Sequence, residues 1–247
     1  SSSRGLGDVY KRQVTGGSNM IYLQSGDDVV TVSSGTNTIH GQEGADQLTI
    51  TGGDNSITSG SEGDTIQISE GINHIATDAG EDTITLSGGT NVLNAGDDDD
   101  TITMTGGVNH ISAGDGDDDV TASGGSANID IRTLDGGLGN DTLRVFSTGT
   151  VVLPAFKNFE SIFISDTVHQ SLNFSLSASL TSIELDSGTT IDGSTITTTI
   201  GSGQALIIDG ITDGDTAAAS VADGGIIIAQ DSLSLIHISE PTRRRTI

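Results

Sequence analysis

A nine-residue period runs through the first half of the chain and limits what it can fold into. Aspartate and asparagine alternate at every ninth position, so that each recurs every 18 residues. The aspartates are Asp28, Asp46, Asp64, Asp82, Asp100 and Asp118, and the asparagines are Asn37, Asn55, Asn73, Asn91 and Asn109. An aliphatic residue follows each by two positions, and a glycine usually precedes each by two. A fixed period of this kind is typical of solenoids.

Each half of the 18-residue unit has the pattern of a turn followed by a short strand. Glycine permits positive φ in the turn, and the aliphatic residue points inward from the strand. One strand carries two large inward residues, such as Ile84 and Leu86, and the other carries one large and one small, such as Leu93 and Ala95. A single unit cannot bury so narrow a core, so the sequence predicts coils stacked in parallel about 4.8 Å apart.

One segment resembles a known repeat closely. Residues 136–143 read Gly-Gly-Leu-Gly-Asn-Asp-Thr-Leu, which is similar to the G-G-x-G-x-D-x-U-x nonapeptide of the RTX (repeats-in-toxin, haemolysin-type) family. Residues 113–118 are nearly as similar, and the resemblance covers about residues 15–146. It implies an all-β fold, namely a parallel β-roll or β-solenoid of 18-residue coils, with calcium held between turns on the same side of adjacent coils.

The aspartates also predict a cation from their charge alone. Stacking places one carboxylate per coil in a column, where neighbours about 4.8 Å apart repel by roughly 3.5 kcal/mol at an effective dielectric of 20. A cation between turns reverses this, and Ca²⁺ tolerates irregular coordination by carboxylate and carbonyl oxygens. The predicted Ca²⁺ ligands are Asp28, Asp46, Asp64, Asp82, Asp100, Asp118 and Asp141. The alternative is a row of surface acids without metal.

Two details modify this prediction. Glu62 and Asp98 stand where a turn glycine is expected, which weakens the prediction for those two turns. The asparagine column is neutral, and stacked amides can hydrogen-bond to one another. We therefore predict that it is a structural ladder and that calcium binds along one edge only.

The two ends of the chain are expected to be foreign to the fold. Codons exist by which residues 3–13 and residues 233–243 translate complementary strands of one DNA segment, as a sequencing-library adaptor would produce. We therefore expect residues 1–13 and 233–247 to be disordered adaptor sequence, and the genuine chain to be a fragment of a longer reading frame. Six of the nine Lys and Arg residues lie in these ends, so the rest is more acidic than the overall charge of −25 indicates.

The β-roll is expected over residues 14–146 and a second β-rich region over residues 147–232. Residues 159–164 and 180–185 share a strand pattern 21 residues apart, and residues 204–208 have the pattern of a third rung. This region resembles the β-rich segments beside RTX repeats in bacterial S-layer and large surface proteins. A wider solenoid is the preferred interpretation and a β-sandwich the alternative.

Composition narrows the function. Strong acidity disfavours nucleic acid, no apolar run is long enough to span a membrane, and the absence of cysteine excludes thiolate metal sites. His40, His74, His110 and His169 are too scattered for a catalytic or zinc set, so this fragment is not expected to be an enzyme.

The favoured function is a calcium-binding structural or adhesive module of a secreted bacterial surface protein, which folds on calcium after export. Expected partners are calcium ions, and also cell-surface polysaccharide or neighbouring surface-protein subunits. One alternative is the calcium-dependent secretion and folding module of an exported hydrolase whose catalytic domain lies elsewhere. A minor alternative is an ice-binding solenoid, because threonines such as Thr83/Thr85 and Thr101/Thr103 recur on an outward face.

Overall fold

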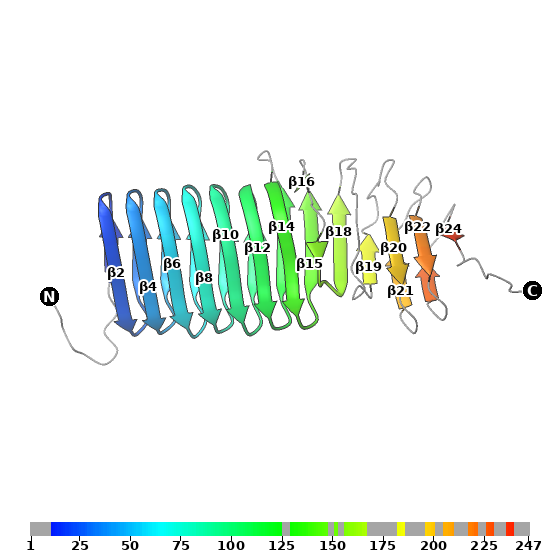
Figure 1. Cartoon of the computed structure of the whole chain (residues 1–247), viewed down its shortest axis with the longest axis horizontal. Helices are drawn as coiled ribbons and strands as arrows, with labels where there is room; N and C mark the ends of the chain where they lie inside the picture. The colour runs from blue at the N-terminus through cyan, green and yellow to red at the C-terminus, as the bar shows by residue number, and fades with distance from the viewer. Residues whose placement is uncertain are drawn as a thin grey trace, which may run out of the picture.

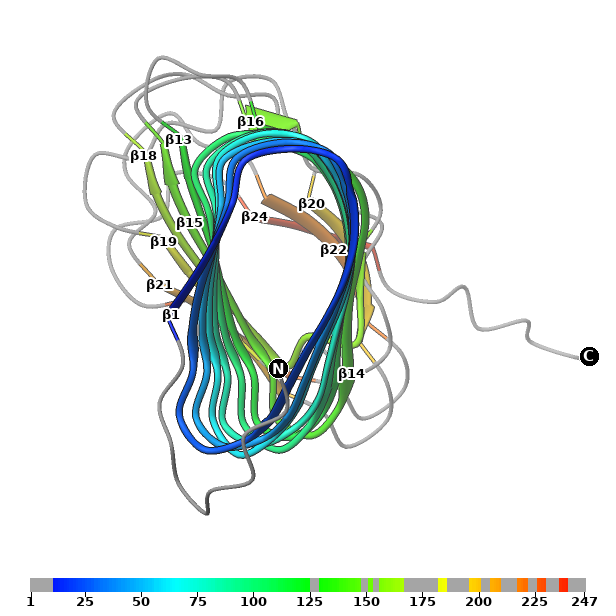
Figure 2. The same ribbon diagram turned by 90° about the vertical axis from the view of Figure 1, so that its left-hand side faces the viewer.

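The chain is a β-solenoid in which each coil contributes one strand to each of two facing parallel sheets (Figures 1 and 2). The computed structural model describes residues 11–124, 129–147, 151–152 and 156–166, and strands within residues 182–185, 196–200, 205–209, 217–221, 226–229 and 236–239. All strand pairings within this part of the chain are parallel. The predicted all-β parallel architecture is confirmed.

The strands form a twelve-stranded sheet, a nine-stranded sheet and a small third sheet. The twelve-stranded sheet contains β1 (Lys11–Val14), β3 (Val29–Val32), β5 (Gln47–Ile50), β7 (Thr65–Ile68), β9 (Thr83–Leu86), β11 (Thr101–Met104), β13 (Asp119–Gly124), β15 (Thr142–Ser147), β18 (Ser161–Asp166), β19 (Ser182–Leu185), β21 (Ala205–Asp209) and β23 (Ile226–Ala229). The nine-stranded sheet contains β2 (Ser18–Ser25), β4 (Thr36–Glu43), β6 (Asp54–Ser61), β8 (Ile72–Ala79), β10 (Thr90–Asp97), β12 (Gly107–Asp115), β14 (Ile129–Leu138), β16 (Val151–Val152) and β17 (Phe156–Lys157). The third sheet contains β20 (Ile196–Ile200), β22 (Ala217–Val221) and β24 (Ile236–Ser239).

The sequence period sets the register of stacking. Residues 18 apart are direct partners in both sheets, as Ile66 and Ile84 are in β7 and β9. The 18-residue period ends where β12 pairs with β14 and the register shifts between Asn109 and His110. After that shift the partners in this coil are 23 residues apart, so Asp118 is followed in its column by Asp141, and the next coils have spacings of 19 and 21. A constant register aligns every equivalent side chain in a straight row.

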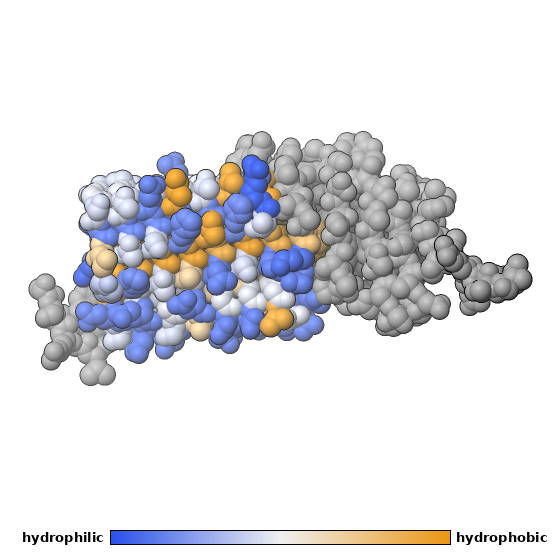
Figure 3. Space-filling model, in the orientation of Figure 1, coloured by the Kyte–Doolittle hydropathy of each residue, from blue (hydrophilic) through white to orange (hydrophobic). Residues whose placement is uncertain are grey.

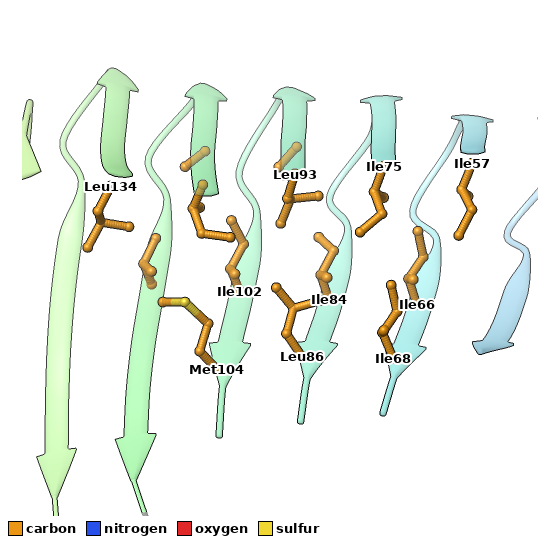
Figure 4. Packing of buried hydrophobic residues seen from close by; sticks show 14 of the residues in the cluster. Ile57, Ile66, Ile68, Ile75, Ile84, Leu86, Leu93, Ile102, Met104 and Leu134 are labelled. Carbon is orange, nitrogen blue, oxygen red and sulfur yellow. The ribbon is translucent and has the colours of Figure 1, made fainter. Parts of the chain in front are cut away.

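The core is a narrow strip between the two sheets. Ile84 and Leu86 from the twelve-stranded sheet are fully buried and face Leu93 from the nine-stranded sheet (Figure 4). Ala95, two residues after Leu93 on the same strand, is fully buried as well. The predicted asymmetry of two large residues opposite one large and one small residue is therefore present. The outer face seen in Figure 3 is largely hydrophilic, apart from a narrow apolar line along the solenoid.

The turns that follow the strands of the nine-stranded sheet share one backbone conformation. Each has two positions with positive φ, and glycine occupies most of them. Glu62 and Asp98 adopt φ of 69° and 79° at the second of these positions, so neither turn departs from the pattern. Sequence reasoning did not single out the first position, where Gln24, Gln42 and Asp78 also have positive φ. Stacking holds these residues in a region that costs L-residues about 1–2 kcal/mol each.

The region after residue 147 adds strands to the same solenoid. β18, β19 and β21 continue the twelve-stranded sheet, and Ile162 pairs with Ile183, which pairs with Ile208. These are the three rungs that the sequence pattern indicated. From the sequence, Asp209, Asp213 and Asp215 could add a calcium site, although turn acids are the preferred interpretation. Asp209 is the last residue of β21, and Asp213 and Asp215 lie outside the described residues.

Parts of the two expected adaptor segments also lie in strands. Lys11–Val14 pairs with Val29–Val32, and Ile236–Ser239 pairs with Ala217–Ser220. This differs from the expected disorder, and the physical reason is that the open edge of a sheet offers backbone donors and acceptors to any sequence. Residues 1–10 and 240–247 lie outside the described residues.

Candidate metal-binding edge

The seven aspartates predicted to bind metal form a single column inside one edge of the solenoid. Each follows the turn after a strand of the nine-stranded sheet, at the lower edge in Figure 1. All are at most 1% exposed: Asp28, Asp46, Asp64, Asp82, Asp100, Asp118 and Asp141. These carboxylates are therefore interior groups, and the alternative of a row of surface acids does not describe their placement.

One oxygen of each carboxylate after the first holds the preceding coil. The backbone N–H of Asp28 donates to Oδ1 of Asp46 at 2.8 Å, and Asp46 N–H donates to Oδ1 of Asp64 at 2.7 Å. The same bond repeats from Asp64 to Asp82, Asp82 to Asp100, Asp100 to Asp118 and Asp118 to Asp141, at 2.6–2.9 Å. The column is thus six consecutive carboxylate-to-backbone steps, and we call it the aspartate column.

The second oxygen of these carboxylates, Oδ2, does not bond to the neighbouring coil in this way. Oδ2 is buried and has no hydrogen-bond partner among the described residues in Asp46, Asp64, Asp82, Asp100, Asp118 and Asp141. A buried polar atom left without a partner costs about 1–3 kcal/mol, and a charged one costs more. Six such atoms in one row are a strong indication that a ligand belongs there.

Burial raises the pKa of the carboxyl groups in the aspartate column. Removal from water raises the pKa of Asp46 to about 7 and that of Asp100 to about 8, against an ordinary value of 3.8. Neighbouring carboxylates raise both further, while the backbone N–H that each accepts opposes the shift. The pKa of Asp82, Asp118 and Asp141 rises to about 6 for the same first cause, and the pKa of Asp64 is raised as well. Without a cation, the ionised column is unfavourable in the folded state.

The surroundings of the free oxygens fit a hard divalent cation. Asp46 Oδ2 and the carbonyl oxygen of Ser59 lie 2.5 and 2.0 Å from the position that a Cβ would take on Gly41. A carboxylate and a carbonyl oxygen therefore converge where no side chain stands, and Ca²⁺ takes both kinds of ligand. No three His, Cys, Asp or Glu side chains within the described ranges group closely enough to hold a metal ion. An ion bound at this edge therefore needs backbone carbonyl oxygens as ligands in addition to the carboxylates of the aspartate column.

Sequence reasoning missed the end of the column. Asp141 N–H donates to Oε2 of Glu160 at 2.8 Å, so a glutamate takes the place of the next aspartate. The signal was present, because Glu160-Ser161-Ile162 has the pattern of Asp141-Thr142-Leu143. It was hidden because the spacing is 19 and the residue is not aspartate.

The opposite edge holds the asparagine ladder. Asn37 Nδ2 donates to Oδ1 of Asn55 at 2.8 Å and also to the carbonyl of Ser34 at 3.3 Å. The inter-coil bond repeats at 2.8–2.9 Å from Asn19 through Asn109. Each amide from Asn37 to Asn91 thus uses its two N–H groups within the protein, Asn109 donates to the carbonyl of Gly106, and the predicted structural ladder is present. This edge is satisfied without any ion.

A parallel β-roll with one satisfied edge and one carboxylate-lined, incompletely satisfied edge defines a class of cation-dependent solenoid. The chain belongs to the RTX calcium-binding nonapeptide repeat family, whose repeat matches residues 14–48, 22–57, 32–66, 68–102, 105–127 and 133–144. The repeats bind calcium ions. Comparison with curated proteins and with solved structures gave no match. Among the described residues, no helix has the length and apolarity needed to cross a membrane.

Proposed function

We propose that the aspartate column holds the calcium of these repeats, with one ion at each of the six successive Asp–Asp pairs. The observation that carries the proposal is the row of buried Oδ2 atoms from Asp46 to Asp141, for which the described part of the chain offers no hydrogen-bond partner. When bound, calcium supplies the positive charge that these carboxylates lack. Backbone carbonyls, such as that of Ser59 of β6 beside Asp46, supply further oxygen ligands.

The module acts as a calcium-dependent folding switch. Without calcium, the folded state must bury a row of mutually repelling carboxylates, which favours the extended chain. An ion that binds only the folded state adds stability according to its concentration relative to its dissociation constant. Extracellular modules bind calcium in the range of about 10⁻⁴–10⁻³ M, a range that keeps them empty where free calcium is low. The chain therefore stays unfolded before export and folds outside the cell.

In its parent, the folded module serves as a rigid structural or adhesive spacer of a secreted bacterial surface protein. A fixed rise per coil gives a rod whose length follows the number of repeats. Thr83 and Thr85 of β9 stack on Thr101 and Thr103 of β11 and form a flat polar outer face. This face suits contact with cell-surface polysaccharide or a neighbouring subunit. Ice binding is disfavoured because Gln67 and Asp119 interrupt the array.

The test is a calcium titration of the chain followed by circular dichroism, with magnesium as the matched divalent control. We expect a disordered spectrum in chelator, a β spectrum with calcium, reversal on chelation and little response to magnesium. Identical spectra with and without calcium would contradict the proposal. A module of an exported hydrolase would fold in the same way, and the two differ in whether a catalytic domain accompanies the module.

A further inference from the structure

A groove lies on the outer face of the nine-stranded sheet, at the lower ends of β10, β12 and β14 in Figure 1. Its volume is about 400 Å³, which is within the range of small-molecule sites. Its floor consists of Gly96, Gly114 and Gly137, which stack in register in successive coils and carry no side chain. The preceding coil has Asp78 at this position, so the bare floor begins at Gly96.

Polar side chains line both sides of the glycine floor. Asn94 and Ser112 stack on one side, and Asp97 and Asp115 stack on the other. Leu138, which is 68% exposed, follows the two aspartates in the third coil. Within the described part of the chain, these four polar side chains make no hydrogen bond or ion pair. Their polar groups are therefore available to a ligand.

Asn158 bounds the groove at its C-terminal end. Lys157 pairs with Asp135, 22 residues earlier. Glu160 follows Asp141 in the aspartate column by only 19 residues. The turn of this coil is therefore shortened, and the glycine floor does not continue into it. Asn158 lines the groove instead, and its Nδ2 donates to Asp135 Oδ1 at 2.7 Å.

We propose that this groove binds an amine-bearing saccharide, with its ammonium group between Asp97 and Asp115 and its hydroxyl groups against Asn94 and Ser112. The proposal deepens the proposed function and rests on it, because it gives the folded module a class of glycan and a place to bind it. The groove is separate from the threonine face of β9 and β11, which belongs to the other sheet.

The charge of the groove favours an amine. Asp97 and Asp115 are direct partners in adjacent strands, where carboxylates about 4.8 Å apart repel by roughly 1 kcal/mol in water. No basic side chain of the described residues lines the groove, and the Nζ of Lys157 lies 2.6 Å from Asp135 Oδ2. An ammonium group between the two carboxylates removes their repulsion. The phosphate, sulfate or carboxylate groups of an anionic glycan would be repelled.

The rest of the lining favours a saccharide over a simple amine. Asn94 offers both donors and an acceptor, and Ser112 offers a hydroxyl, so this side matches the hydroxyl groups of a sugar ring. The glycine floor leaves a strip against which a ring can lie, and Leu138 offers an apolar contact to its C–H groups. A polyamine would use the two carboxylates and leave the opposite side without partners.

The test is isothermal titration calorimetry of the calcium-folded chain with the disaccharide of glucosamine. The N-acetylated disaccharide has the same rings without the charge, and spermidine has the charge without the rings. We expect the wild type to bind the glucosamine disaccharide most tightly of the three. Asp115→Asn should weaken this binding about fivefold, as the loss of one exposed ion pair would. Ser112→Phe, which fills the groove, should abolish it.

Asp54→Asn and Thr58→Phe are the matched controls. Asp54 is an exposed acid of β6, and Thr58 lies in the same outward column as Ser112, three coils earlier. Each makes the same chemical change outside the groove, so both variants should bind the glucosamine disaccharide as the wild type does.

Several results would overturn the site. Equal affinity for the N-acetylated disaccharide would remove the role of the carboxylates, and equal affinity for spermidine would remove the role of the ring. Binding that is unchanged in Asp115→Asn and Ser112→Phe would place the sugar elsewhere. If Ser112→Phe does not fold, Asp115→Asn decides.

Circular dichroism separates this inference from the proposed function. If the chain folds on calcium and does not bind the glucosamine disaccharide, only this inference fails. If the chain is already folded in chelator, the proposed function fails, and the same titrations in chelator decide on the groove. If the chain is unfolded in both conditions, both fail.

Discussion

Asp82 and Asp100 occupy the same place in successive coils, and the backbone N–H of Asp82 donates to Oδ1 of Asp100 at 2.8 Å. The other oxygen of each carboxylate is buried and has no hydrogen-bond partner in the part of the chain that the structure describes. One side chain therefore has two different tasks. Its Oδ1 fixes the spacing of the coils, and its Oδ2 is left for an ion.

These two tasks can be separated by Asp82→Asn. Asparagine keeps the Oδ1 acceptor for Asp64 N–H but removes the negative charge at the other atom. In chelator we expect the folded state of the variant to be less unfavourable than that of the wild type by about 1–3 kcal/mol, because an unpaired buried charge is lost. In calcium we expect it to need a higher calcium concentration to fold, because it loses a charged ligand at two adjacent pairs. Folding induced by an osmolyte in chelator, and calcium titration, measure the two effects.

Asp54→Asn is the matched control for this change. Asp54 is exposed on the outer face of β6, and its substitution alters the net charge equally. It should leave the calcium midpoint close to that of the wild type. If both variants shift the midpoint alike, the effect comes from net charge and the aspartate column has no special role.

Asn91→Asp is the reverse change, because it adds a carboxylate to the asparagine ladder, and we expect it to destabilise the fold. Asn91 Nδ2 donates to the carbonyl of Gly88 at 3.0 Å and to Asn109 Oδ1 at 2.9 Å. A carboxylate cannot donate these bonds and places a charge beside two acceptors. We expect a loss of about 3–5 kcal/mol at saturating calcium, with the number of bound ions unchanged.

Asn94→Asp, an exposed position on the same strand β10, is the control and should change stability by less than about 0.5 kcal/mol. An Asn91→Asp variant that gains a calcium ion would show that the two edges are interchangeable. It would contradict the view of the ladder as a purely structural element.

Much of this architecture could be predicted because a repeat converts sequence spacing into spatial contact. When the period equals the coil length, Asp82 must stack on Asp100 and Asn91 on Asn109. The one-sided distribution of carboxylates follows directly from that spacing. The alternation of Ile84 and Leu86 with outward residues likewise fixes which side chains fill the core.

What escaped prediction is what departs from the repeat. Glu160 was missed because the turn before it is shortened and a glutamate compensates for the lost length. Positive φ at Gln42 and Asp78 was missed because neither residue prefers it, and the neighbouring coils impose it. The strand at Lys11–Val14 was not predicted, because residues 1–13 were interpreted as foreign to the fold.

The imposed turn conformation gives a further prediction, for Gly114. This residue has φ of 131°, and a Cβ on it would lie 1.9 Å from the carbonyl oxygen of Gly96. We expect Gly114→Ala to destabilise the calcium-bound fold by more than about 2 kcal/mol. Asp78→Gly should instead stabilise it by about 0.5–1 kcal/mol, because it relieves an unfavourable φ of 70° at an equivalent turn position. Denaturant unfolding at saturating calcium compares the stability of the two variants. Equal changes in stability would contradict the view that the turn imposes positive φ at these positions.

Stability should depend on pH with opposite sign in the absence and presence of calcium. In chelator, burial raises the pKa of Asp82 and Asp118 to about 6, of Asp46 to about 7 and of Asp100 to about 8, from 3.8 in the unfolded chain. The folded state therefore binds protons more tightly than the unfolded state. Its stability is greatest below about pH 4 and falls as pH rises toward 8, by up to about 1.4 kcal/mol per pH unit for each titrating group.

At saturating calcium the dependence reverses. Protons then compete with the ion for the same oxygens, so stability falls as the pH is lowered from 8 to 4. Osmolyte-induced folding in chelator and urea unfolding in calcium, each at pH 4.5, 6 and 7.5, measure the two slopes. A calcium-free chain that is most stable at pH 7.5 would show that the aspartate column is not the group that opposes folding. The Asp82→Asn variant should reduce both slopes, because it removes one titrating group from each state.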